Sequence, residues 1–199
     1  MRIVIVGAGL AGLVAARELH RAGADVVVLD KGRSPGGRLA TRRVGGATLD
    51  HGAQFFTVRS PAFATTVADW RERGLVHVWN HGFSIDPPHD HAVGTPGVDA
   101  DVAGDGALTG DADPVDGHPR YAASRGMNSL AKDLAVGLDV RCSTMVFAVR
   151  RDADSGDVSV AIDDGTSFDA DAVIVTAPLP QAFALMIDGG FELDEALFR

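Results

Sequence analysis

Short apolar runs separated by one amphipathic segment make up the first thirty residues. Residues 3–6 form a β-branched apolar run, which predicts a strand buried on both faces. Apolar residues then recur at helical spacing from Leu13 to Leu19, with polar residues between them, and predict a helix that ends near Gly23. A second apolar run at 26–29 predicts the next strand. This strand–helix–strand order is typical of a parallel sheet covered by helices.

The rest of the chain mixes helical and strand-like patterns. Phe63, Val67 and Trp70 lie at i, i+4 and i+7 and predict an amphipathic helix over 62–73. The other predicted elements are, in chain order, a strand or hairpin within 75–85, a helix through 127–134, an antiparallel meander of strands at 140–150, 157–162 and 166–168, and a buried strand at 172–178 that returns to the parallel sheet.

One long stretch lacks the apolar residues that a core needs. Residues 86–119 are rich in Asp, Gly, Pro and Ala, which predicts a long loop or insertion. Five histidines lie in or near it: His77, His81, His89, His91 and His118. Their spacing fits no metal-ligand pattern, so no metal site is expected.

Composition narrows the classes of function. The 199 residues carry a formal net charge of −9, with pI near 5.1, which argues against a general binder of nucleic acid or of anionic membranes. The single cysteine, Cys142, excludes an internal disulfide and fits a reducing, cytoplasmic compartment. No leader segment or apolar run of membrane-spanning length is visible, so we expect a soluble protein.

The first predicted strand runs directly into a glycine-rich turn. Gly7 allows the tight turn, Gly9 lets backbone approach a pyrophosphate, and Gly12 permits close packing of helix on strand. The helix N-terminus adds unpaired N–H groups for phosphate. Asp30 follows the second strand and would accept hydrogen bonds from adenosine ribose hydroxyls, while its charge disfavours NADP. Together these features predict a dinucleotide site, whose turn reads Gly7-Ala8-Gly9-Leu10-Ala11-Gly12.

The segment after Asp30 indicates which dinucleotide is bound. An NAD-binding domain usually proceeds from this acid into another helix and strand, but here the chain enters the basic, glycine-rich loop "KGRSPGGRLATRR" at residues 31–43. In an acidic chain this local positive charge favours a second wall for a diphosphate. Its candidate ligands are Lys31, Gly36, Gly37 and Arg38.

The sequence from Val4 to Arg43 resembles the N-terminal segment of the flavin amine-oxidase superfamily, in which a Gly-Gly-Arg after the acid packs against the FAD diphosphate. Three more blocks, "LDHGAQFFTVRS" from Leu49, "RYAASRGMNSLAKDLA" from Arg120 and "DAVIVTAPLPQA" from Asp171, are similar to its renalase-like branch of NAD(P)/FAD-dependent oxidoreductases. That family more often has Glu where Asp30 stands.

The resemblance implies a noncovalently bound FAD as cofactor, with Gln54, Val146 and Ala177 joining the residues above as ligands. It also implies hydride transfer from a small donor, a dihydronicotinamide or an amine, to the flavin and then to O2. No metal and no catalytic side chain is assigned. His51 lies near the expected flavin, but a structural role is favoured for it.

These observations predict an α/β fold: a Rossmann-like FAD-binding domain with a parallel sheet, helices and a small antiparallel meander, plus part of a second, substrate domain. The expected bounds are 1–60 and 120–182 for the FAD-binding domain, 61–119 for the partial substrate domain with its loop at 86–119, and 183–199 for the start of a truncated continuation.

Two alternatives to the renalase-like enzyme stay open. One is a desaturase or protoporphyrinogen oxidase-like flavoenzyme with the same fold. The other is a truncated FAD-binding module without its own catalysis. The sequence likewise leaves open a homo-oligomer or a missing C-terminal half.

Overall fold

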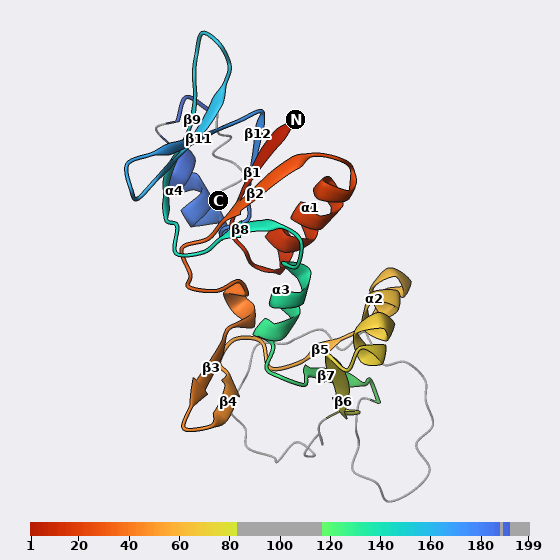
Figure 1. Cartoon of the computed structure of the whole chain (residues 1–199). Coiled ribbons are helices and arrows are strands. Elements are labelled where there is room, and N and C mark those ends of the chain that lie inside the picture. The colour runs from red at the N-terminus through yellow and green to blue at the C-terminus, as the bar shows by residue number, and fades with distance from the viewer. Residues whose placement is uncertain (83–116, 188, 192–199) are drawn as a thin grey trace, which may run out of the picture.

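The computed structural model describes residues 1–82, 117–187 and 189–191. At its centre lies a four-stranded parallel sheet in the order β12-β1-β2-β8 (Figure 1). The predicted parallel sheet is therefore confirmed. Its strands are β1 (Arg2–Val6), β2 (Asp25–Leu29), β8 (Asp139–Arg141) and β12 (Ala172–Val175).

Successive residues of β1 and β2 face opposite layers, which is why both strands are apolar throughout their buried lengths. Ile3 and Ile5 pack in the same core as buried residues of α1 (Leu10–Arg21) and α3 (Asn128–Leu134). Val4 and Val6 pack in a second core with the antiparallel meander and the side chains of α4 (Leu179–Met186). The central strands thus separate two hydrophobic layers.

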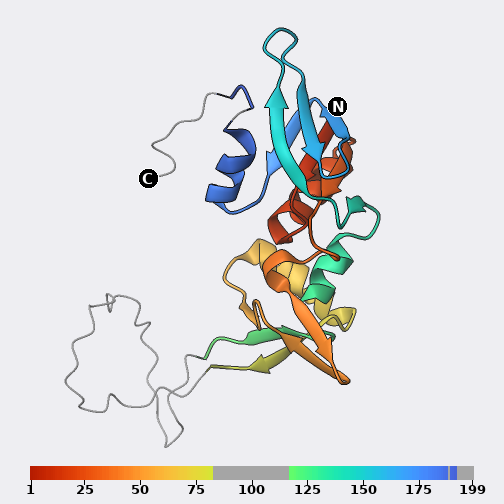
Figure 2. The same ribbon diagram turned by 90° about the vertical axis from the view of Figure 1, so that its left-hand side faces the viewer.

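The meander consists of β9 (Val146–Arg151), β10 (Val158–Ile162) and β11 (Ser167–Ala170), in the order β11-β10-β9. Figure 2 shows α4 beside it. The prediction of one antiparallel strand over 140–150 is wrong, because the chain turns inside this range. Ser143 adopts a positive φ of 55°, and the Thr144 N–H donates to the Asp30 carbonyl. The part before the turn is β8, which joins the parallel sheet.

A separate three-stranded sheet, called the smaller sheet below, lies on the other side of α3 from the parallel sheet (Figure 1). It pairs β5 (Phe56–Thr57), β7 (Arg120–Ala123) and β6 (Val76–Asn80) in the order β5-β7-β6. The helix expected over 62–73 is α2 (Pro61–Glu72), which begins where Ser60 Oγ accepts a hydrogen bond from the Phe63 N–H.

The smaller sheet and α2 are joined by aromatic packing. The Phe56 ring lies 5.6 Å from that of Tyr121 and 5.5 Å from that of Phe63, and Val67 and Trp70 are buried beside them. The apolar stripe of α2 therefore packs in the core, as its spacing indicates.

A hairpin that the pattern did not reveal follows the basic loop. Its strands are β3 (Thr41–Val44) and β4 (Ala47–Asp50), joined by Gly45 and Gly46, both with positive φ. A short 3-10 helix, η1 (Gly37–Leu39), precedes it.

Most of the loop expected at 86–119, including His89 and His91, lies outside the described residues, as do residues 192–199 of the expected continuation. Within the described ranges, none of the helices has both the length and the apolar character to span a bilayer.

Candidate dinucleotide site

A cavity of about 1150 Å³ opens at the carboxyl ends of the parallel strands. Crevices at this edge are where open α/β sheets bind their ligands, and the volume exceeds the usual range for small-molecule pockets. Its lining comes from the turn after β1, the loop after β2, the start of β9, the residues after β12, and α4. Segments far apart in the sequence therefore share one site.

The glycines of the turn have three different jobs. Gly7 has a φ of 111°, which side chains rarely adopt. A Cβ on Gly12 would collide with the Gly7 carbonyl oxygen, so Gly12 is fixed by packing of helix on strand. A Cβ on Gly9 would have no atom of the described residues within 4 Å, apart from its own chain neighbours. Since Gly9 lines the cavity, that open space is where a ligand would lie.

The N-terminus of α1 offers hydrogen-bond donors to the same space. The first N–H groups of any helix lack a partner within the helix. Here the N-cap is Gly9, no side chain in the described ranges caps the helix, and its first turn holds no acidic residue. Leu10 and Ala11 line the cavity. Uncapped donors and the helix dipole favour an anion such as a diphosphate.

Asp30 holds the backbone around this space. One carboxylate oxygen accepts a hydrogen bond of 2.6 Å from the Ala8 N–H, and the other accepts one of 2.6 Å from the Gly32 N–H. The carboxylate therefore joins the glycine turn to the basic loop. A carboxylate accepts up to about four hydrogen bonds, so the contact to ribose hydroxyls stays a prediction.

The basic loop packs directly on the turn. The Gly36 N–H donates to the Ala8 carbonyl over 2.9 Å. Gly37 has a φ of 52°, and a Cβ there would lie 3.3 Å from the Cα of Gly9. Lys31 and Arg38 bring two positive charges to a lining in which Asp30 is the single acid among the described residues. The loop thus forms the opposite wall with a local excess of positive charge.

The structure brings most of the sequence-predicted ligands into the lining. Ala8 and Gly12 are buried beneath the turn and act through backbone and packing. Gln54 is exposed and is not a lining residue, although its neighbour Ala53 is. The predicted ligands found in the lining are Gly7, Gly9, Leu10, Ala11, Asp30, Lys31, Gly36, Gly37, Arg38, Val146 and Ala177.

Thr176 and Asn128 are among the lining residues that the sequence did not predict. Thr176 follows β12, and its hydroxyl lies 3.0 Å from the Val6 carbonyl and 3.2 Å from that of Gly7. Asn128 is only 6% exposed, and its buried Oδ1 has no hydrogen-bond partner among the described residues. A polar residue at the end of an apolar strand was an available signal for Thr176. For Asn128 the pattern offered none.

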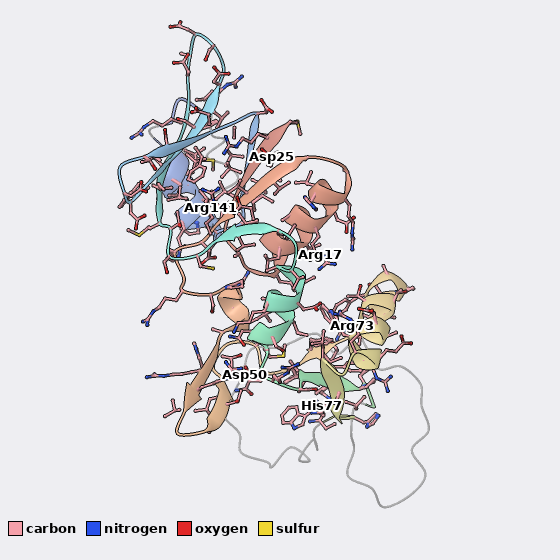
Figure 3. The ribbon with its side chains drawn as sticks, in the orientation of Figure 1. Arg17, Asp25, Asp50, Arg73, His77 and Arg141 are labelled. Atoms are coloured by element: carbon pink, nitrogen blue, oxygen red, sulfur yellow. The ribbon has the colours of Figure 1, made fainter. Side chains whose placement is uncertain are left out.

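One carboxylate ties the hairpin to α3 beside the cavity. Asp50 Oδ1 accepts hydrogen bonds from the Thr41 hydroxyl and, over 2.9 Å, from the Met127 N–H (Figure 3). Thr41 Oγ1 in turn accepts a hydrogen bond of 3.0 Å from the Asn128 N–H. His51 itself is exposed, and its backbone N–H donates to Ala40. Asp50 therefore has a structural role, and it fixes the start of α3.

The surroundings of Cys142, which lies near Asp30, favour the thiol over the thiolate. Burial raises the pKa of its thiol, and the nearby Asp30 carboxylate raises that pKa further. The thiol form is unreactive as a nucleophile or metal ligand. In the part of the chain that the structure describes, no group of three or more His, Cys, Asp or Glu side chains could hold a metal ion.

These features fit a dinucleotide such as FAD. The space in front of Gly9 admits a ligand, and the uncapped helix and two cations suit its diphosphate. Asn128 adds an amide oxygen that no group in the described ranges satisfies. The Asn128 amide is independent of the glycine and charge pattern that suggested the site.

Family comparison agrees with the geometry. Residues 5–70 match the family described as NAD(P)-binding Rossmann-like domain. Residues 68–188, more than half of the chain, match the family described as flavin containing amine oxidoreductase.

Curated relatives match over short stretches of the chain. Hydroxyneurosporene desaturase of Rubrivivax gelatinosus is 47% identical over 58 residues, which is 29% of this chain and 11% of that protein. The flavin-containing monoamine oxidase AofH of Mycobacterium tuberculosis is 51% identical over 53 residues, which is 27% of this chain and 12% of that protein. These matches therefore cover only about a tenth of each relative's length.

Solved structures match over nearly the whole chain. Putrescine oxidase bound to putrescine superposes with a TM-score of 0.63 at 18% identity, covering 94% of this chain and 60% of that one. A fatty acid isomerase from P. acnes gives 0.61 at 17% identity, covering 93% and 60%. The fold is shared, and this chain spans about three fifths of those proteins. It belongs to the flavin-containing amine oxidoreductases, a family of FAD-dependent oxidoreductases.

Proposed function

We propose that this chain binds FAD noncovalently in the cavity and belongs to an oxidoreductase of renalase-like type. The observation that carries the proposal is the pairing of two walls: the glycine turn with its uncapped helix, and the basic loop hydrogen-bonded to that turn through Gly36. Such a site orients a diphosphate from both sides.

In this proposal each part of the lining has a separate task. The first N–H groups of α1 and the side chain of Arg38 bind the diphosphate. Asp30 and Lys31 border the adenosine, with Val146 at the start of β9 beside the adenine. Ala177, after β12, and Ala53, after the hairpin, border the flavin. All these residues line the cavity.

Bound FAD supplies the redox chemistry, which we propose is acceptance of a hydride from a dihydronicotinamide or amine and delivery of the electrons to O2, giving peroxide. The residues of this chain position the cofactor and exclude water from its buried side. No side chain is assigned as an obligatory base.

The renalase-like subtype is supported by the way its characteristic blocks meet. Thr41 belongs to "GGRLATRR", Asp50 to "LDHGAQFF" and Asn128 to "RGMNSLAK". The hydroxyl of Thr41 and the carboxylate of Asp50 join all three blocks beside the cavity. Sequence features that are distant in the chain therefore form one structural unit.

Anaerobic flavin bleaching tests this proposal. Purified protein should carry or take up FAD with flavin absorbance, and that absorbance should bleach on addition of a dihydronicotinamide or an amine and return with O2. Bleaching by a dihydronicotinamide but not by amines would support the renalase-like subtype. A protein that neither carries nor retains FAD would refute the proposal for this chain.

A second candidate is an FAD-binding module without turnover of its own. It is favoured by the exposure of the cavity wall at α1, where Leu10 is 43% exposed and Val14 is 44% exposed. A ligand there would border water on one side, so the closed, dry environment that supports redox catalysis would be incomplete. Flavin absorbance that no donor bleaches would favour this candidate.

A further inference from the structure

The peptide unit between Gly7 and Ala8 is held at both of its polar ends by side chains from neighbouring strands. At its carbonyl end, the Thr176 hydroxyl lies 3.2 Å from the Gly7 oxygen and 3.0 Å from the Val6 oxygen, so its one proton is shared between these two acceptors. At its amide end, the Ala8 N–H donates to Asp30 over 2.6 Å. Thr176 directly follows β12 and Asp30 directly follows β2, the two strands that flank β1.

The Thr176 hydroxyl also lies close to two glycines of the turn. A Cβ on Gly7 would lie 2.5 Å from Thr176 Oγ1, and one on Gly12 would lie 3.1 Å from it. The hydroxyl therefore occupies space that side chains at both positions would need. The backbone N–H of Thr176 continues the strand ladder by donating to the Val6 carbonyl over 2.9 Å, so the backbone of Thr176 is fixed as well.

Orientation of this peptide decides what the turn presents to the cavity. The Ala8 carbonyl, in the next peptide unit, accepts a hydrogen bond from the Gly36 N–H of the basic loop, and the Gly32 N–H donates to the other oxygen of Asp30. The loop and the turn are thus positioned through the same short set of hydrogen bonds. A rotated Gly7–Ala8 peptide would lose its hydrogen bond to Asp30, the carboxylate that also holds the loop at Gly32.

We propose that Thr176 and Asp30 form a clamp on the Gly7–Ala8 peptide that presets the diphosphate-binding turn before the ligand arrives. Both are positioning residues in this role, since they act on the ligand through backbone. Preorganisation of this kind raises affinity by removing the cost of ordering the site on binding. The inference rests on the proposed function, because it assumes that the cavity binds a dinucleotide.

If the clamp acts in this way, removing the Thr176 hydroxyl should lower the affinity for ligands that carry a phosphate and for no others. Binding of ADP and of adenosine is measured by NMR titration for the wild type, Thr176→Val and Thr176→Ser. Thr176→Val should weaken ADP by about three- to tenfold, the equivalent of one hydrogen bond, and leave adenosine unchanged. Thr176→Ser keeps the hydroxyl and should bind ADP like the wild type. If Thr176→Val does not fold, Thr176→Ala removes the hydroxyl without added bulk.

The matched control is Thr65→Val. Thr65 is exposed on α2, and its hydroxyl also donates to a backbone carbonyl, that of Pro61. It should alter neither affinity. Equal weakening of ADP and adenosine by Thr176→Val would indicate general destabilisation and would overturn the clamp, as would an unchanged affinity for ADP.

A double variant tests whether both residues act on one peptide. Asp30→Asn combined with Thr176→Val should weaken ADP by less than the product of the two single effects, because the second loss acts on a peptide already released. A fully multiplicative loss would show two independent contributions and contradict the clamp. A wild type that binds neither ADP nor FAD would refute the proposed function itself, which distinguishes the two failures.

Discussion

Gly9 and Gly12 belong to one turn, but the structure gives them different roles. Gly9 has an ordinary φ of −76° and open space where a Cβ would lie, whereas a Cβ on Gly12 would meet backbone. We expect Gly12→Ala to lower the free energy of unfolding by about 3 kcal/mol through overpacking. Gly9→Ala should cost about 1 kcal/mol or less. Urea denaturation of both variants measures this difference, and equal losses would contradict the packing described.

Asn128 keeps an unpartnered buried amide oxygen beside the cavity, at a cost to the stability of the apo protein. Its buried Oδ1 lacks a partner within the described ranges, so Asn128→Leu, of similar volume, should leave the apo melting temperature equal or higher. The upward shift in melting temperature that FAD produces should become smaller, because the amide can no longer bind the ligand.

Asn80 provides the contrasting variant in the smaller sheet. Its Oδ1 accepts a hydrogen bond from the Gly82 N–H over 3.2 Å. Asn80→Leu should therefore lower the apo melting temperature and leave the FAD-induced shift intact. Thermal unfolding of both variants with and without FAD checks the pair. An undiminished FAD shift in Asn128→Leu would rule out a role for Asn128 in binding.

At the scale of elements, the basic loop offers a direct test of which cation matters. Arg38 lines the cavity, whereas Arg33 is exposed outside it. Arg38→Met should weaken FAD about ten- to hundredfold, since a charge-assisted hydrogen bond contributes roughly 1.5–3 kcal/mol. Arg33→Met, which removes the same charge from the same loop, should have little effect. Fluorescence titration with FAD distinguishes them, and comparable losses would assign the effect to net charge alone.

An ion pair joins α2 to α3. Arg73, just after α2, donates hydrogen bonds of 2.6 and 2.9 Å to the two carboxylate oxygens of Asp133, and Arg17 reaches the carbonyls at the end of α3 (Figure 3). The hydrogen bonds from Arg73 lower the pKa of Asp133. A lowered pKa in the folded state means that the pair stabilises the protein above the ordinary pKa of Asp, near 4, and loses this effect as pH falls.

Replacing that carboxylate should therefore have a pH-dependent cost. Because the Arg73 side chain is 44% exposed, we expect Asp133→Asn to cost about 1 kcal/mol or less at pH 7, or about 2–4 °C in melting temperature. The difference from the wild type should shrink as pH falls below about 4. Glu72→Gln on α2 controls for loss of one negative charge. A gap that widens toward low pH would contradict a lowered pKa for Asp133 in the folded protein.

Sequence patterns identified helices, whose hydrogen bonds are local, and strands that are apolar on both faces. The run at 3–6, the helix behind it and the run at 26–29 are all present, because an apolar strand buried on both faces has a distinctive composition. The run at 140–150 was split by the turn at Ser143, which depends on hydrogen bonds to the distant Asp30 and Gly32. The hairpin after the basic loop leaves Val44 and Leu49 about half exposed, so no buried face marks it in the pattern, and its Gly45-Gly46 turn was the available signal.

At the scale of the whole molecule, the site is formed where distant segments converge. The sequence revealed the turn and the loop because glycine spacing and charge carry their own chemical meaning. Thr176 and Asn128 reach the same cavity from about 170 and 120 residues away from the turn, and their roles depend on topology that periodicity does not encode. Gln54 shows the converse, since a residue assigned by resemblance lies exposed outside the lining.

The central claim is that the space in front of Gly9 holds the FAD diphosphate. Its most direct test is the dissociation constant of FAD for the wild type and for Gly9→Val, with the folded fraction of each verified by circular dichroism. Valine at an open, ordinary backbone position should leave the protein folded but fill that space. We expect FAD to bind the wild type and to lose at least about a hundredfold in affinity for Gly9→Val, the equivalent of roughly 3 kcal/mol. Equal affinity in two folded proteins would contradict it.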